Sequence, residues 1–255
     1  MGASDLDVAV EGEGRPLVLV HSLLSDRTAY EPFVRLIAGR RKVVLLNLPG
    51  FGASPPDGAS TLRDHATALA RVFDDMSLPP ETDIMGNGLG GFVALTFAAD
   101  HGDRFRRLLL VGSALAFPEA GRATFRGLAD KVDSDGIAAV AGPAIRRMFP
   151  DDFIAANPEI VADRTRVLAT IDPNVFAAAC RALAALDLAP LLPRIRNRTL
   201  VATGEHDGAT PPALGRALAA RLPHGEFMEL VGLGHAPHLQ APDEFLAAVS
   251  GFLRL

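Results

Sequence analysis

Cysteine is almost absent from this chain of 255 residues, and so are blocks of like charge and long apolar runs. The single cysteine, Cys180, excludes an internal disulfide and any metal cluster built on cysteines, and we interpret it as a small buried apolar residue. Acidic and basic residues are interspersed and give a formal charge of -5, so we expect no nucleic-acid partner. No apolar run reaches the ~18 residues that a membrane span needs. The first ten residues hold two aspartates and no basic segment ahead of an apolar one, so we expect a cytoplasmic protein with no membrane contact.

The remaining composition, 49% hydrophobic and 22% charged, is typical of a protein with a sizeable core. Apolar runs bounded by turn residues alternate with segments of helical period, which predicts a mostly parallel central sheet covered by helices on both faces. Strands are expected at 16–20, 42–46, 83–85, 107–111, 199–203 and 227–231, with an edge hairpin over 7–14. Helices are expected at 28–38, 62–75, 89–100, 212–221 and 242–253.

The alternation stops between residues 117 and 188, where no strand is expected. Four helical segments are expected there, at 119–131, 135–148, 152–170 and 173–186. An insertion after the strand at 107–111 lies over the carboxyl ends of parallel strands, so we expect residues 117–188 to form a helical cap. The core is then made of residues 1–116 and 189–255.

A strand-turn-helix corner, Gly86-Asn87-Gly88-Leu89-Gly90-Gly91, lacks the side chain that such a corner usually carries. It matches the Gly-x-Ser-x-Gly nucleophile elbow, in which a tight turn lifts a serine oxygen above the sheet. Here Gly88 stands at the nucleophile position, so we expect no covalent acyl-enzyme turnover, whereas slow or specialised hydrolysis stays open.

Three further stretches follow expected strands, where open α/β sheets place their ligand sites. They are Val20-His21-Ser22-Leu23-Leu24-Ser25, Gly204-Glu205-His206-Asp207-Gly208 and Gly232-Leu233-Gly234-His235-Ala236-Pro237-His238. The order of elbow, acid and histidine is that of α/β-hydrolases. Along nearly its whole length the chain resembles the α/β-hydrolase fold superfamily. From Ala129 onward it is similar to the 3-oxoadipate enol-lactonase-like group, notably in Thr203-Gly-Glu-His-Asp…Thr210-Pro-Pro.

The resemblance implies roles for several residues. His235 matches the catalytic base, Asp207 the carboxylate that orients it, and the backbone amides of Leu23 and Leu89 the oxyanion donors. The sequence departs from the pattern at Ser22, where glycine is usual after the histidine, and at Asn47, where aspartate is common. The Ser22 hydroxyl either bonds its own loop backbone, which is the more common case, or holds a ligand oxygen.

Gly88 itself has more than one explanation. Glycine relieves the strain of a positive-φ corner, which costs another residue about 1–3 kcal/mol, so a protein without need of a nucleophile gains stability here. Alternatively, the missing side chain leaves room for a water that His235 activates. A deliberate inactive variant is a third explanation, although alanine is the commoner choice.

Other candidates are weaker. Arg146 and Arg147 either hold a substrate carboxylate or lie on a solvated helix face. His21 and Asn87, which adjoin the expected oxyanion site, complete the candidate substrate-binding set with Ser22. Ser25 and Ser113 are substitute nucleophiles in principle, but neither lies on a motif that activates its oxygen.

These observations favour a hydrolase of a small ester or lactone, with or without a carboxylate, in which the His235–Asp207 pair activates water. Two alternatives stay open: a ligand-binding pseudoenzyme, and a lyase or oxygenase that uses the pair to abstract a proton without a cofactor. We expect no cofactor and no metal, and a small-molecule substrate is the expected partner. A homodimer is left open.

Overall fold

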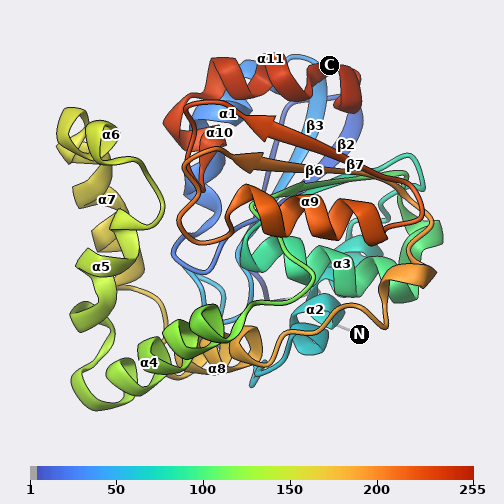
Figure 1. The fold of residues 1–255 in the computed structure, drawn as a ribbon. Helices are drawn as coiled ribbons and strands as arrows, with labels where there is room; N and C mark the ends of the chain where they lie inside the picture. The colour runs from blue at the N-terminus through green and yellow to red at the C-terminus, as the bar shows by residue number, and fades with distance from the viewer. Residues whose placement is uncertain (1–4) are drawn as a thin grey trace.

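The computed structural model describes residues 5–255, so the first four residues of the expected core lie outside it. Its centre is a sheet of seven strands in the order β1-β3-β2-β4-β5-β6-β7 (Figure 1). The strands are β1 (Val8–Glu11), β2 (Arg15–Val20), β3 (Arg41–Leu46), β4 (Asp83–Asn87), β5 (Arg107–Val111), β6 (Arg198–Gly204) and β7 (Gly225–Leu230). Only β1 is antiparallel to its neighbour. The predicted mostly parallel sheet is therefore confirmed.

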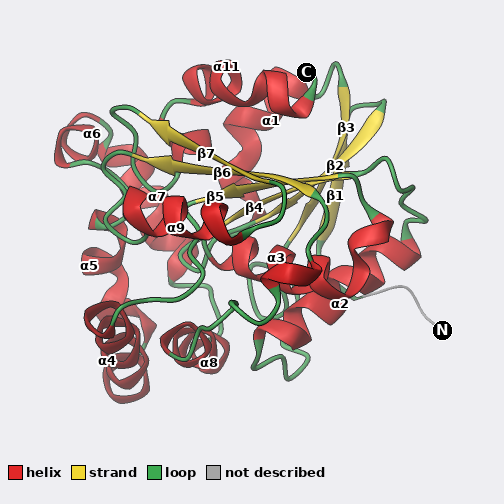
Figure 2. Ribbon diagram, turned by 45° about the vertical axis from the view of Figure 1, so that its right-hand side comes forward, coloured by secondary structure: helices red, strands yellow, loops and turns green. Residues whose placement is uncertain are grey.

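Helices cover both faces of this sheet, as Figures 1 and 2 show. On one face lie α1 (Glu31–Ile37), α10 (Pro237–Gln240) and α11 (Pro242–Leu253), and on the other α2 (Leu62–Asp75), α3 (Leu89–His101) and α9 (Pro212–Arg221). Alternate residues of β2 point to opposite faces of the sheet. Leu17 and Leu19 pack with α1 and α11, whereas Val18 and Val20 pack with α2 and α3. Burial on both faces explains why the inner strands are continuous apolar runs.

The N-terminal strand differs from the expected hairpin. β1 pairs with β3, with Val8 opposite Leu46, and is not hydrogen-bonded to β2. The pairing with β3 places β1 at the edge of the sheet, so the edge position is right and the hairpin is wrong. A tight turn joins adjacent antiparallel strands, whereas β1 and β2 are separated by β3.

Residues 117–188 form helices and contain no strand. They comprise α4 (Glu119–Asp135), α5 (Ala141–Arg146), α6 (Asp151–Ala156), α7 (Pro158–Leu168) and α8 (Pro173–Ala184), and a single β-bridge joins Ala116 to Asp187. α4 and α8 lie side by side in both views, and α5, α6 and α7 stand on the side to which the strand arrowheads of β6 and β7 point (Figures 1 and 2).

Two of the four expected helices in this stretch are interrupted. The segment 152–170 breaks between α6 and α7 because the ring of Pro158 disfavours helical backbone at Asn157, whose φ is -131° and ψ 57°. The segment 135–148 is split because α4 continues to Asp135 and ends at Gly136, after which a 3-10 turn leads into α5. Within residues 5–255, no single helix is both long and apolar enough to cross a membrane; only α7 and α8 taken together pass that test, as a pair bent by 100°.

The order of the strands fixes where a ligand can bind. The chain runs from β2 outward to β3 and then returns to β4 on the other side of β2, so the direction of winding reverses between β2 and β4. A crevice opens outside the carboxyl ends of the strands at such a reversal. The register aligns Val20 with Gly86, so the loop after Val20 and the turn at Gly88 leave the sheet side by side.

Candidate active site

The corner after β4 has the geometry of a nucleophile elbow. Gly88, between β4 and α3, has a φ of 50° and a ψ of -116°, a conformation that residues with a Cβ adopt only with strain. The turn is also tightly packed, since a Cβ on Gly90 would lie 2.1 Å from the carbonyl oxygen of Val20. The glycines of the motif therefore allow α3 to begin directly against β2.

His235 and Asp207 are brought together at the carboxyl end of the sheet. The Nδ1 of His235 lies 2.8 Å from the Oδ2 of Asp207, and both side chains are buried. The carboxylate accepts three further hydrogen bonds, from the backbone amides of Ala209 and Thr210 at its Oδ1 and from the hydroxyl of Thr210 at its Oδ2. Because a carboxylate accepts, this contact assigns the donor role to the His235 Nδ1 and leaves the Nε2 toward Ser22.

Two residues that support this pair were given no role in the site from the sequence. Thr210 holds Asp207, as described above. Gly112, directly after β5, has a φ of 57°, and a Cβ there would lie 2.7 Å from the Nδ1 of His235 and 2.8 Å from the Oδ2 of Asp207. A glycine at the end of a buried strand is the only sequence signal for this role, and it does not reveal which side chains approach it.

Ser22 lies where the elbow side chain is missing. Its hydroxyl is 3.3 Å from the Nε2 of His235, and a Cβ on Gly88 would lie 2.5 Å from that hydroxyl oxygen. The expectation that Ser22 bonds its own loop backbone is therefore wrong. The neighbouring strand β2 places the Ser22 hydroxyl in the space that a side chain on Gly88 would take, so the room for a water beside His235 lies in the cavity beyond Ser22.

Two backbone amides near Gly88 and Ser22 have no hydrogen-bond partner among the described residues. The N–H groups of Leu23 and Leu89 donate no hydrogen bond to any residue between 5 and 255. Leu89 is the first residue of α3, where the helix dipole favours negative charge. Free amides at a cavity are the donors that stabilise an oxyanion.

A cavity opens over these groups. It offers about 50 Å³ to the centres of water molecules, whereas one water needs only ~10–15 Å³. Its floor includes Gly88, Ser22 and His235, and its walls are mainly apolar: Leu23, Leu24, Leu89, Phe92, Phe117, Phe125, Leu128, Ala144, Met148, Leu183 and Ala209. Several of these wall residues belong to α4, α5 and α8, so the helices of residues 117–188 enclose the site.

The candidate substrate-binding residues differ in position. Arg147 lines the cavity and donates to the carbonyl oxygen of Gly208 at 3.0 Å, whereas Arg146 is exposed and does not line it. Asn87 points away from the cavity and donates to the carbonyl oxygens of Val111 and His235 at 3.1 and 2.9 Å. Asn87 therefore fixes the loop that carries the catalytic candidate.

His21 also hydrogen-bonds to loop backbone and does not line the cavity. Its Nε2 accepts from the amide of Leu48 at 3.0 Å, and its Nδ1 lies 2.9 Å from the carbonyl oxygen of Ser22. Burial lowers the pKa of His21, which keeps the ring neutral and suits one donor and one acceptor nitrogen. These two bonds fix the backbone of Ser22.

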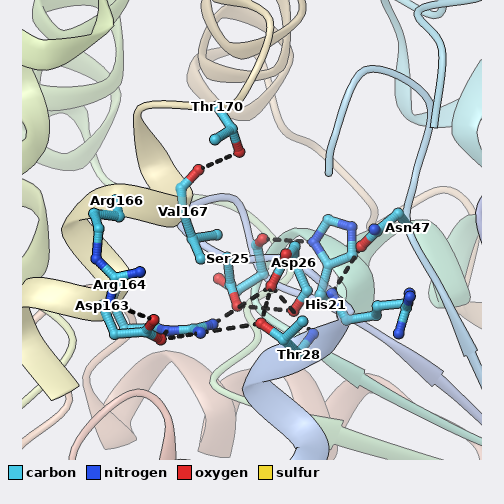
Figure 3. A network of polar contacts seen from close by, with 12 residues as sticks. His21, Ser25, Asp26, Thr28, Asn47, Asp163, Arg164, Arg166, Val167 and Thr170 are labelled. Atoms are coloured by element: carbon cyan, nitrogen blue, oxygen red, sulfur yellow. Dashed lines mark hydrogen bonds and ion pairs between the residues drawn. The ribbon is translucent and has the colours of Figure 1, made fainter. Parts of the chain in front are cut away.

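A buried arginine fixes the other end of the same loop, as Figure 3 shows. Arg164 of α7 lies 3.5 Å from the Oδ1 of Asp26 and donates to the hydroxyl of Thr28 at 3.0 Å. It also pairs with Asp163 next to it. The loop after β2 is thus tied to the loop after β3 at His21 and to α7 at Asp26. Ser25 bonds the carbonyl oxygen of Asp26 within this loop, and neither Ser25 nor Ser113 lines the cavity.

Comparison with known proteins places this geometry in a family. The alpha/beta hydrolase fold family matches residues 15–242. The chain is 27% identical over 252 residues to 3-oxoadipate enol-lactonase 2 of Acinetobacter baylyi, covering 98% of this chain and 93% of that protein. Among solved structures it is similar to the enol-lactonase from Burkholderia xenovorans LB400, with a TM-score of 0.91, 27% identity and coverage of 98% and 96%. It is also similar to a thermophilic esterase from Thermogutta terrifontis, with a TM-score of 0.89, 28% identity and coverage of 98% and 93%. The family match spans every strand of the sheet except β1, and this chain therefore belongs to the alpha/beta hydrolase fold family.

Proposed function

We propose that this protein hydrolyses a small ester or lactone, with His235 as the proton acceptor and Asp207 as the group that orients it. The observation that carries the proposal is the placement of the His235 Nε2 at the cavity floor while the Nδ1 is held by Asp207. A neutral imidazole held in this tautomer is suited to general-base catalysis near neutral pH. The free amides of Leu23 and Leu89 complete the machinery by stabilising the oxyanion.

The cavity and the relatives support this substrate class. The walls are apolar, which suits the hydrocarbon part of an ester or lactone, and Arg147 supplies one cation for a carboxylate-bearing substrate. The similar proteins include an enol-lactonase and an esterase. In this proposal residues 117–188 act as the cap and residues 1–116 with 189–255 as the core, so that substrate binds between them.

The test is a panel of short p-nitrophenyl esters and unsubstituted lactones assayed with the wild type and with His235→Ala and Asp207→Asn. We expect hydrolysis in the wild type and a loss of at least ~100-fold in kcat/KM in both variants, since each removes part of the general base. His206→Ala is the matched control because His206 is an exposed histidine next to Asp207, and we expect it to leave the rate unchanged.

Other outcomes separate the alternatives. Saturable binding of an organic acid with no product over long incubation identifies a ligand-binding pseudoenzyme and overturns the proposal. Product formed without incorporation of oxygen from ¹⁸O-labelled water points instead to proton abstraction of the lyase or oxygenase kind. Hydrolysis that survives His235→Ala contradicts the assigned base.

A further inference from the structure

We infer that Ser22 is the catalytic nucleophile of this protein, replacing the serine that is missing from the elbow. The inference rests on the proposed function and adds a covalent acyl-enzyme step to it. The serine and the glycine are exchanged relative to the usual pattern: glycine is usual after the histidine of this loop and serine at the elbow, whereas this chain has Ser22 and Gly88.

The sheet register explains how the exchange keeps the hydroxyl in place. Val20 of β2 pairs with Gly86 of β4, and each chain then advances two residues, to Ser22 and Gly88. The Ser22 hydroxyl oxygen lies 2.5 Å from the position that a Cβ on Gly88 would take. The two positions therefore compete for a single space beside the His235 ring, and only one of them can carry a side chain without rearrangement.

The contacts of Ser22 are those of a nucleophile paired with a base. The side chain is 3% exposed, lines the cavity and has the His235 Nε2 as its hydrogen-bond partner at 3.3 Å. This distance is long for a hydrogen bond, and such contacts tighten when substrate binds. Ser25, three residues further on, shows the structural alternative, because its hydroxyl donates to the carbonyl oxygen of Asp26.

The chemistry balances with groups already in place. The Ser22 oxygen attacks the carbonyl carbon and its proton passes to the His235 Nε2. The amide of Leu23, which follows the nucleophile in sequence as an elbow amide does, and that of Leu89 bind the resulting oxyanion. When the carbon–oxygen bond to the leaving alkoxide breaks, His235 returns its proton to that oxygen. Water then attacks the acyl-Ser22 ester, gives a proton to His235, and releases the acid as the proton returns to Ser22.

The experiment uses a fluorophosphonate probe on the whole protein, with intact mass measurement and peptide mapping. In the labelling step the Ser22 oxygen attacks phosphorus and fluoride leaves. We expect one label, on Ser22, that is lost in Ser22→Ala and His235→Ala and is retained in Ser25→Ala, the matched control. We also expect Ser22→Ala to lower kcat/KM for ester hydrolysis by at least ~1,000-fold, since a nucleophile carries more of the rate than this.

A second variant protects the test against misfolding. In Ser22→Gly combined with Gly88→Ser the hydroxyl returns to the elbow, and we expect labelling at position 88 and hydrolysis above that of either single variant. Ester hydrolysis that requires His235 but persists in Ser22→Ala, with no label on Ser22, overturns the inference and leaves the proposed function standing. A label on Ser22 without any hydrolysis shows a reactive serine but overturns the proposed function and, with it, the catalytic role of Ser22; a wild type that is neither labelled nor active overturns both as well.

Discussion

Gly112→Ala tests whether the His235–Asp207 pair depends on close approach of the backbone after β5. A Cβ at this position would lie 2.7 Å from the His235 Nδ1 and 2.8 Å from the Asp207 Oδ2. Real Cβ atoms do not approach other heavy atoms so closely, so the ring and the carboxylate must separate or the strand end must shift. Neither neighbour is the free end of a flexible chain, because Asp207 is held by Thr210 and by two backbone amides.

The expected loss in the free energy of unfolding of Gly112→Ala has two parts. The left-handed backbone at Gly112, with a φ of 57°, costs an alanine about 1–2 kcal/mol. Displacing the charge-assisted hydrogen bond of the pair adds about 1.5–3 kcal/mol. The sum predicts a loss of roughly 2.5–5 kcal/mol in the free energy of unfolding. A ring displaced by ~1 Å also lowers kcat/KM for ester hydrolysis by about 100-fold.

Gly232→Ala is the matched control. Gly232 also has a positive φ, 73°, but a Cβ there has no heavy atom within 4 Å, so only the conformational cost of about 1–2 kcal/mol applies. Guanidinium unfolding of both variants measures the difference and does not require activity. Equal free energies of unfolding for the two variants, together with full activity in Gly112→Ala, refute the reasoning.

Three further predictions concern buried groups outside the reacting atoms. Burial lowers the pKa of His65 to about 4 and that of His238 to about 3. As the pH falls, these two histidines are protonated in the unfolded chain before they are protonated in the folded protein. Their contribution to the free energy of unfolding is therefore complete above pH 6.5 and decreases below it, by roughly 3 kcal/mol at pH 5.5 for the two together. A guanidinium midpoint that is equal at pH 7 and 5.5 contradicts this. Burial raises the pKa of Cys180 to about 12, so Ellman's reagent should react with it only in denaturant, and rapid reaction of the native protein contradicts its burial. Arg164→Met removes the ion pair of the buried Asp26, whose carboxylate is left with its bonds from the amide and hydroxyl of Thr28, and should cost roughly 2–3 kcal/mol. Guanidinium unfolding against the exposed control Arg166→Met measures this loss, and equal stability of the two variants contradicts a tie between α7 and the loop.

Much of the fold follows from local patterns in the chain. The inner strands are apolar runs because both of their faces are covered. α2 begins after Thr61, its N-cap, because the Thr61 hydroxyl accepts from the Asp64 amide while the Asp64 carboxylate accepts from the Thr61 amide. Local pattern does not fix how distant segments pair. The N-terminal strand was expected in a hairpin, yet it pairs with β3, because the partner of an edge strand depends on the order of the whole sheet. The break at Asn157 was missed because helical period continues on both sides of Pro158, although the proline itself is the physical cause.

The sequence alone determined that a serine-less elbow, an acid and a histidine each follow the end of a strand, because these are properties of residue type and order. It also determined that Gly88 cannot attack a carbonyl. Only the tertiary structure decided what occupies the space above Gly88, since that depends on the pairing of β2 with β4, two strands that are far apart in the chain. Their register brings Ser22 beside Gly88, where its hydroxyl meets His235 from the loop after β7, a contact between residues more than two hundred positions apart that no local pattern encodes.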